Sequence, residues 1–401
     1  MVKIRSYNSR FDRARVEDLE RRCEVGPKEH VFLFIDTMGD PICRIRNSPQ
    51  FNMLVAELGN EIVGVIRGTV KVVTIKKSPK NPVKVGYVLG LRVSPIHRRK
   101  GIGSDLVRHI EEWFLSKNVD YAYMATEKDN EASVKLFIHK FGYVRFKTPS
   151  ILVHPVGRRP DLRPSAGVRI SKVSVECAEF LYRSFMGGSA DFFPVDIDKI
   201  VRNKLSLGTW VAFFRGDSSG EFGGATIAEL PKSWAMLSVW NCAHLFKLTL
   251  GRQTLSCSLY GTMAKLLNDA VPCLKPPPAL PDLVGPFGFY FVYGLHREGP
   301  LSGKLVRALW KFVCNNNLLV CGTHDSDHHD NNNNNVKLIV TEVGCCDDNK
   351  HLRLDIPHWR LLSCPEDLWC IKALKNNEQK QSLQELIANS KGALFVDPRE
   401  V

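Results

Sequence analysis

The sequence lacks several features that would tie the protein to a membrane or to an oxidising compartment. No apolar run approaches the roughly 20 residues that a membrane span needs. The first 20 residues, MVKIRSYNSRFDRARVEDLE, lack the apolar stretch of a secretory signal. The 12 cysteines form no C-x-x-C pair, and only Cys345 and Cys346 are adjacent. We therefore expect reduced thiols in a nuclear or cytosolic protein with no membrane partner.

The charge balance favours partners that carry phosphate. Lysine and arginine number 55 against 42 aspartates and glutamates, which gives a net charge of +13. Such a surface attracts nucleic acid or a phosphorylated cofactor but does not distinguish between them. A chain of 401 residues with 44% hydrophobic residues is globular and too long for one ordinary core, so we expect two domains.

The first 155 residues alternate between strand and helix patterns. Period-2 and period-3.6 apolar spacing, broken by glycine and proline, indicates a mixed α+β fold. The expected strands lie at 2–8, 53–73 (a hairpin), 83–95 and 119–127, and the expected helices at 13–24, 104–114 and 131–143.

One segment carries the main chemical signal. SPIHRRKGIGSDLVRHIEEWF, residues 94–114, joins a buried strand to an amphipathic helix through two glycines, Gly101 and Gly103. Glycines there let the backbone approach a ligand, and the free N–H groups of the helix start favour an anion. We interpret the loop as a pyrophosphate cradle. A plain glycine turn with solvated basic residues is the alternative, and the spacing is neither the Rossmann nor the P-loop pattern.

Two motifs resemble those of the GCN5-related N-acetyltransferase (GNAT) family, over roughly residues 3–155. The pattern [QR]-x-x-G-x-[GA] is matched by Arg98, Gly101 and Gly103. A later pattern is matched by Asn130, Ser133, Phe137 and Gly142-Tyr143. The resemblance implies an α+β fold with a mixed, mostly antiparallel sheet whose central strand pair splays apart, flanked by helices. With the internal repeat described below, we expect two such folds in tandem.

The resemblance also implies a co-substrate and its contacts. Acetyl-CoA would place its pyrophosphate on the loop and its pantetheine arm between the splayed strands, with no metal involved. Asn130 would either lie near the arm or order the start of its helix. The implied binding residues are Leu91, Arg92, Val93, Arg98, Arg99, Lys100, Gly101, Ile102, Gly103, Ser104, Asn130, Ser133 and Phe137.

The catalytic residues are less well defined. Many family members carry a tyrosine that protonates the leaving thiolate where this chain has Phe137, so Tyr143, Tyr123 or water would substitute. The strand before the loop carries no carboxylate to act as a base. Glu127, Glu57 and His97 are the candidates, and we assign Glu127 as base and Tyr143 as acid.

More narrowly, the whole chain resembles the Hookless family of plant N-acetyltransferases. That resemblance implies a nuclear regulator of hormone-responsive growth that acetylates protein lysines, such as those of histone tails. It also implies that the protein can associate with chromatin. A GNAT-like scaffold without catalysis is the second hypothesis, and a small-amine substrate such as a polyamine is the third.

The second half repeats the plan of the first. Gly294-Leu295 matches Gly90-Leu91, and Glu342 follows a strand as Glu127 does. The corresponding loop, HREGPLSGK, lacks the R-x-x-G-x-G spacing, so we expect a degenerate second domain with doubtful cofactor binding. The expected boundaries are 1–155 for the first domain, 156–167 for a linker, 168–374 for the second domain with a flexible Asp/His/Asn loop at 323–335, and 375–401 for a polar tail.

Overall fold

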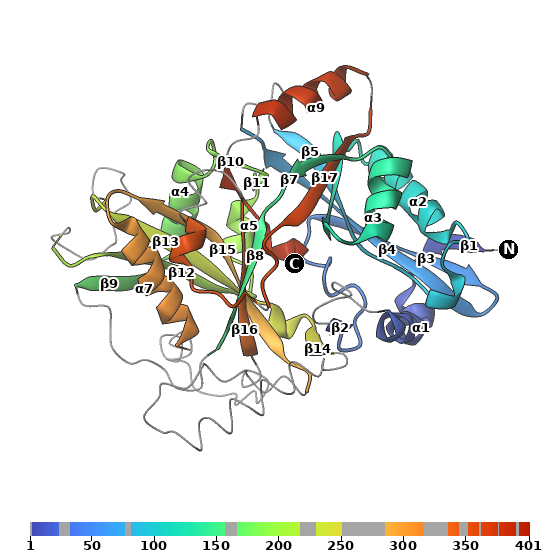
Figure 1. Ribbon diagram of the computed structural model, residues 1–401, viewed down its shortest axis with the longest axis horizontal. Coiled ribbons are helices and arrows are strands. Elements are labelled where there is room, and N and C mark those ends of the chain that lie inside the picture. Colours follow the sequence, from blue (N-terminus) through green and yellow to red (C-terminus); the bar gives the residue numbers. More distant parts are fainter. Residues whose placement is uncertain are drawn as a thin grey trace.

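The architecture comes from a computed structural model (Figure 1). It describes residues 2–23, 33–76, 82–156, 167–216, 230–250, 285–315, 336–344, 352–360, 362–375, 377–389 and 393–401. The predicted linker and the predicted Asp/His/Asn loop lie almost wholly outside the described residues. No helix in the described segments is long and apolar enough to cross a membrane.

The first sheet holds most of the strands from the first half of the chain. Its order is β1-β3-β4-β5-β6-β17-β7, with the short β11 pairing with β4. Within the described residues, β5 and β6 are the neighbours that run parallel, and its other neighbours run antiparallel. The strands are β1 (Lys3–Ser6), β3 (Gln50–Leu58), β4 (Glu61–Thr74), β5 (Val83–Val93), β6 (Tyr121–Glu127), β7 (Val144–Lys147), β11 (Phe193–Pro194) and β17 (Asp367–Ala373).

The second sheet repeats this plan. Its order is β9-β12-β13-β15-β16-β8, and among these described strands β15 and β16 run parallel, as their counterparts β5 and β6 do. The strands are β8 (Ser150–Pro155), β9 (Val168–Val173), β12 (Ser206–Phe214), β13 (Trp234–Asn241), β15 (Gly288–Glu298) and β16 (Val336–Val343). Two small pairs complete the strands: β2 (Leu33–Asp36) with β14 (Lys247–Leu250), and β10 (Ala190–Asp191) with β18 (Ala393–Leu394).

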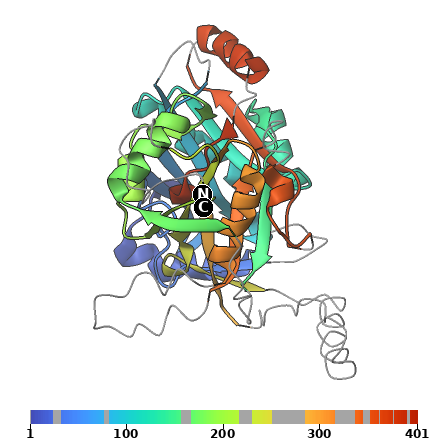
Figure 2. The same ribbon diagram turned by 90° about the vertical axis from the view of Figure 1, so that its left-hand side faces the viewer.

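Each sheet has helices on both faces because the helices are amphipathic. In the first sheet α1 (Ser9–Arg22) covers one face, while α2 (Ile102–Ser116) and α3 (Glu131–Val134) cover the other. In the second, α4 (Val175–Phe185) and α7 (Ser302–Cys314) lie on opposite faces (Figure 2). The remaining helices are η1 (Pro95–His97), η2 (Lys135–Lys140), α5 (Ile197–Val201), η4 (Cys242–His244), α9 (Asn377–Asn389) and η6 (Pro398–Glu400). The tandem α+β fold expected from the sequence is confirmed.

The two sheets exchange one strand each, which the sequence reading did not foresee. β8 follows the first sheet's last strand but pairs with β16 of the second sheet. β17 comes from the end of the second half but lies between β6 and β7 of the first sheet. Strand pairing therefore crosses the predicted boundaries at 155 and 374. A strand signal alone does not say which edge the strand will join.

The inner faces of the two sheets share one hydrophobic core. Tyr123 and Trp369 of the first sheet belong to the same buried cluster as Trp240 and Phe291 of the second. Separate cores lie under α2 and under α7. A shared core of this kind makes the stability of each sheet depend on the other.

The end of the chain differs from the polar tail that was predicted. α9 forms a helix in this tail, but the residues after it turn back into the shared core, where Phe395 is 1% exposed. Lys71 on β4 bonds to Glu400 at 2.7 Å and to Asp397 at 3.3 Å. Arg399 forms an ion pair with the same Asp397, with 2.7 Å between Nη2 and Oδ2. Buried charges with partners of opposite sign hold this segment in place.

The exchange predicts that the two halves do not fold separately. A fragment of residues 1–155 would leave β6 and β7 without their middle strand and β8 without a partner. We expect the fragment to aggregate or to lack a cooperative thermal transition, and we expect a synthetic peptide of residues 362–375 to improve its solubility. Circular dichroism during heating, with the full chain as control, tests this. Cooperative unfolding of the fragment alone would contradict it.

Candidate functional site

The first sheet opens into a V between its two parallel strands. β5 and β6 pair from Val85 with Tyr121 to Val88 with Met124, and then pairing stops although both strands continue. A bulge in β5 at this point shifts its register with β4, and Gly90 there has φ +60°. The bulge turns β5 away from β6, so the two strands no longer pair with each other beyond Val88 and Met124, while β5 still pairs with β4 and β6 with β17. This is the splayed pair that the family resemblance implied.

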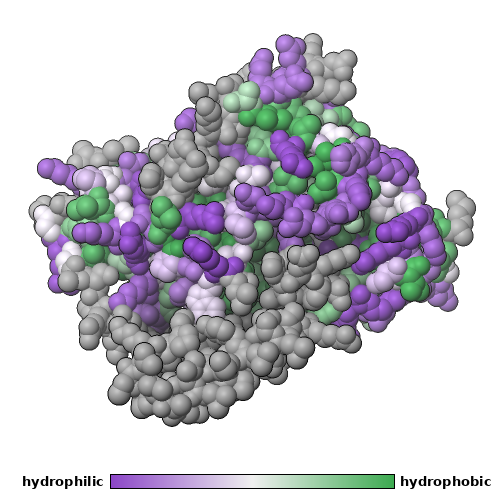
Figure 3. Space-filling model, in the orientation of Figure 1, coloured by the Kyte–Doolittle hydropathy of each residue, from purple (hydrophilic) through white to green (hydrophobic). Residues whose placement is uncertain are grey.

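A glycine loop and a helix start lie at the far end of β5. Gly101 is the N-cap residue of α2 with φ +86°, and a Cβ there would have nothing within 4 Å. Arg98, Arg99 and Lys100 beside it are exposed. Figure 3 shows a largely hydrophilic surface over this part of the molecule, where α2 lies in Figure 1. The backbone N–H groups and the positive end of the helix therefore face open space among basic side chains, which suits an anion.

A further cation, which the sequence reading missed, stands at the same helix start. Lys140 of η2 donates from Nζ to Ser104 Oγ at 2.8 Å. A Cβ on Gly103 would lie 3.7 Å from Val93 and 3.9 Å from Leu136, which is ordinary contact. The one-residue expansion of η2 into a π-helix brings Lys140 to this place, and a helical pattern in the sequence gives no sign of such a bulge.

The remaining predicted contacts on β5 line the V, but one of them is engaged elsewhere. Leu91, Arg92 and Val93 are all half-buried. Arg92 lies 3.5 Å from the buried carboxylate of Glu20, which itself pairs with Arg67 at 2.8 Å. Arg92 therefore has a structural partner.

The second motif forms the opposite wall. Asn130 caps α3 by accepting a hydrogen bond from the Ser133 backbone N–H at 3.2 Å, so it orders the helix start. Phe137 is buried in the core under α2 and packs edge-to-face on Tyr143 at 5.2 Å between ring centroids. Burial, with Glu111 nearby, raises the pKa of Tyr143 well above its ordinary value, so its hydroxyl stays protonated. Its role as acid stays a prediction.

The structure does not bring the two predicted catalytic residues together. Alternation along β6 places Tyr121, Tyr123 and Glu127 on the face that points to the shared core. Tyr143 lies in the core on the opposite face. An acid and a base on opposite faces of one sheet would have to act through the V between the strands.

A row of aromatic rings marks the apex of the V on the inner face. Tyr87 of β5 stacks on Tyr123 of β6 at 4.7 Å, and Tyr123 stacks on Trp369 of β17 at 5.4 Å. Tyr123 donates to Glu400 at 2.5 Å. Tyr87 is half-buried, and its hydroxyl has no hydrogen-bond partner within the described segments. The row thus ends at the apex in Tyr87, whose pKa is raised well above its ordinary value by burial and by the carboxylates nearby.

Carboxylates gather around this row. Asp367 of β17 lies directly opposite Glu127 of β6. Burial raises the pKa of Asp367, and Glu127 adds to the rise. Glu342 of β16 accepts a hydrogen bond from Trp369 Nε1 at 2.7 Å. The sequence reading singled out Glu342 as a counterpart of Glu127 but missed Asp367, because its strand comes from the other half of the chain.

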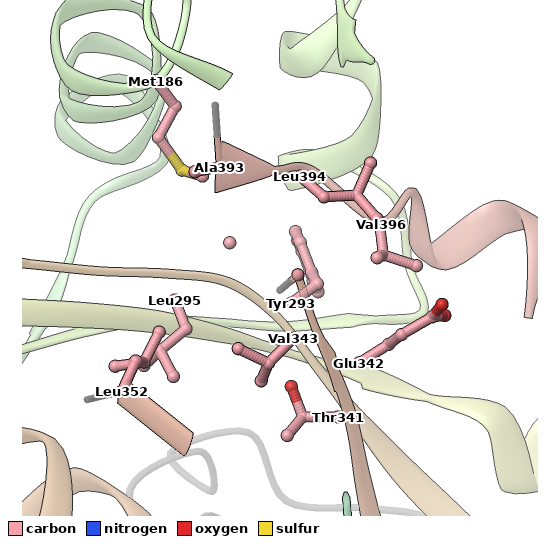
Figure 4. Close-up of a pocket in the computed structure, with 12 residues that line it drawn as sticks. Met186, Tyr293, Leu295, Thr341, Glu342, Val343, Leu352, Ala393, Leu394 and Val396 are labelled. Atoms are coloured by element: carbon pink, nitrogen blue, oxygen red, sulfur yellow. The ribbon is translucent and has the colours of Figure 1, made fainter. Parts of the chain in front are cut away.

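The second domain keeps the V but fills it. Pairing of β15 and β16 ends at Val292 with Thr341, and Gly294 has φ +60° as Gly90 does. Leu394 and Val396 lie across the opening, and the cavity that remains has about 30 Å³, room for water but not for an acyl arm (Figure 4).

The anion position of the second domain is also occupied. Arg307 of α7 pairs with Asp355 at 2.6 Å, and Arg297 of β15 pairs with the same carboxylate. A Cβ on Gly303, in the first turn of α7, would collide with that carboxylate. An internal carboxylate therefore sits over the helix start where the first domain has open space.

The similarity to known proteins agrees with this geometry. The chain is 42% identical over its whole length to "Probable N-acetyltransferase HLS1-like" of Arabidopsis thaliana, covering 99% of that protein. It is 43% identical over its whole length to "Probable N-acetyltransferase HLS1" of the same plant, covering all of it. The family model for the acetyltransferase (GNAT) family matches residues 13–143. The chain belongs to the acetyltransferase (GNAT) family. The Hookless-type resemblance is confirmed with it.

Two further similarities are more distant. "Acetyl transferase GW6a" of Oryza sativa subsp. japonica is 33% identical over the whole chain, which covers 97% of that protein. The structure of Saccharomyces cerevisiae N-myristoyltransferase with bound myristoyl-CoA superposes with a TM-score of 0.52 at 11% identity, over 93% of this chain and 79% of that one. At that identity the likeness concerns the fold alone.

The open loop predicts a sensitive position. Gly101→Asp would place a carboxylate over the helix start and strain a backbone with positive φ, so we expect at least about a 100-fold loss of acetyl-CoA affinity. Isothermal titration measures it. Gly167→Asp is the matched control, since Gly167 also has positive φ and open space but lies just before β9 of the second sheet. Equal affinity in Gly101→Asp and the wild type would remove the loop assignment.

The occupied second cradle predicts the stoichiometry. With Asp355 over α7 and Leu394 across the V, we expect acetyl-CoA to bind once per chain, and Gly101→Asp to abolish the titration signal altogether. Two equal sites, or a residual site in that variant, would show that the second domain binds the ligand as well.

Proposed function

We propose that the first domain is an acetyl-CoA-dependent N-acetyltransferase that acts on amines of protein lysines. The observation that carries the proposal is the joint presence of an open V and an exposed helix start with Gly101, in a chain of this family. The loop of Arg98 to Ser104, with Lys140, would hold the pyrophosphate. The unpaired edge of β5 at Leu91 and Val93 would hold the pantetheine arm.

The inner face of the sheet would receive the acceptor. A lysine amine with pKa ~10.4 costs roughly 4–5 kcal/mol to deprotonate at neutral pH. A thiolate of pKa ~8.5 leaves at a cost of roughly 2 kcal/mol. A base therefore contributes more than an acid, and the loss of a tyrosine at Phe137 is the smaller deficit. Glu127, Asp367 and Glu342 supply carboxylates on that face.

The local charge also suits a basic acceptor. The chain as a whole carries +13, which would repel a histone tail over long range. The carboxyl groups beside Tyr87 would offer a cationic amine a local site of opposite sign, because the amine itself favours their ionised forms. The resemblance to the Hookless family supports the finer parts of the proposal. These are histone tails as acceptors, chromatin association, a nuclear location and a role in hormone-responsive growth.

Phe137 favours a second candidate, a scaffold of the same fold without catalysis. Isothermal titration with acetyl-CoA, followed by transfer of radiolabelled acetyl groups, separates the two. The acceptors are a mixture of core histones in one arm and spermidine in the other. We expect binding and labelled histone. Binding without transfer to either acceptor supports the scaffold, and labelled spermidine alone would replace protein lysines by small amines.

A further inference from the structure

One carboxylate of the second domain points into the first. Glu342 lies near the end of β16, and Figure 4 shows its carboxylate turned away from the cavity of its own domain. It reaches Trp369, which the strand exchange has placed in the first sheet, and accepts a hydrogen bond from Nε1 at 2.7 Å. The second domain thus contributes a polar group to the inner face of the first.

The partner of Glu342 stands beside the apex of the V. Trp369 pairs in register with Ala125, the first residue of β6 after its pairing with β5 ends. Its ring stacks on Tyr123, and Tyr123 stacks on Tyr87. Glu342 is also close enough to contribute to the raised pKa of Tyr87. The Glu342 carboxylate therefore lies beside the apex of the V. This is where an acceptor amine would meet a thioester held along β5.

We propose that Glu342 is the catalytic residue that takes the proton from the acceptor amine. The inference rests on the proposed acetyl transfer. The Glu342 carboxylate takes one proton from the lysine ammonium and passes it to water. The neutral amine nitrogen then forms its bond to the thioester carbonyl carbon, the C–S bond breaks, and the second proton of the nitrogen passes to Glu342. That proton then goes to water, and the sulfur leaves as thiolate.

Neither of the other nearby glutamates is as well placed. Glu400 is 7% exposed, and both its oxygens already accept hydrogen bonds, from Thr69, Lys71 and Tyr123. Glu127 is at the last position of β6, farther from the apex than Ala125. Glu342 is half-buried and has one oxygen bonded to Trp369. It is therefore oriented by Trp369, and its second oxygen has no hydrogen-bond partner within the described segments.

The surrounding charges keep this carboxylate basic. Burial raises the pKa of Glu342, and Asp367 of β17 and Glu400 of η6 raise it further, while the hydrogen bond from Trp369 acts in the opposite direction. Two cations lie near these carboxylates. Arg44 lies near Tyr87, and Lys71 is paired with Glu400. A base whose pKa is raised toward the working pH accepts a proton more readily than an ordinary glutamate.

The test compares Glu342→Gln with the wild type in acetyl transfer to core histones. We expect turnover to fall about 100-fold or more, as for loss of a general base, with the acetyl-CoA dissociation constant unchanged. The rise of turnover with pH that reports the base should disappear. Trp369→Phe, which removes the N–H that lowers the pKa of Glu342, should move that rise to a higher pH and retain part of the turnover. Glu385→Gln, an exposed change on α9, is the matched control and should leave turnover unchanged.

Thermal unfolding adds a readout that does not depend on turnover. A carboxyl group with a raised pKa in the folded state weakens folding once the pH exceeds its ordinary pKa. Glu342→Gln removes that cost and can still accept from Trp369. We therefore expect its melting temperature at pH 8 to equal or exceed that of the wild type. A marked loss of stability would indicate a structural role and overturn the proposal.

The outcomes distinguish a failure of the proposed acetyl transfer from a failure of the role of Glu342. Wild-type protein that binds acetyl-CoA but transfers to neither histones nor spermidine refutes the proposed function, and the role of Glu342 falls with it. Wild-type transfer with full turnover in Glu342→Gln refutes only the role of Glu342. Normal pH dependence in Glu342→Gln together with its loss in Glu127→Gln would return the role of base to Glu127.

Discussion

The exchange of β8 and β17 is the constraint on which the rest of the structure depends. Because each sheet is completed by a strand from the other half, the two inner faces are held against each other and share one core. That arrangement places Trp369 beside β6 and brings Glu342 within hydrogen-bonding distance of it. If a linker alone joined the two GNAT folds, nothing would hold a residue of one fold beside the inner face of the other.

The two domains show what a cradle looks like when it is open and when it is filled. Both keep the bulge glycine, Gly90 or Gly294, and both keep a helix that starts beyond the splayed strand. In the second, Asp355 lies over the helix start and pairs with two arginines, and hydrophobic side chains close the V. The fold therefore survives without a ligand because the chain supplies a charge and a volume of its own.

Sequence reasoning predicted the local elements well and the long-range ones poorly. The loop of Arg98 to Ser104 could be placed because glycine spacing, helix amphipathicity and strand alternation are all local signals. The position of Asp367 opposite Glu127 could not, because strand pairing is decided by the whole sheet. The burial of Phe395 and Glu400 was hidden by the polar residues of α9 that precede them. Lys140 reached the cradle only through the π-helical turn.

The position of β17 in the chain has a consequence for synthesis on the ribosome. β6 and β7 are made early, yet the strand that belongs between them ends at Ala373. At the usual pace of translation this leaves two open sheet edges waiting for on the order of ten seconds or more. Such edges attract other nascent chains. Cellular yield would then depend on chaperones that shield the unfinished sheet, more than on the stability of the finished one.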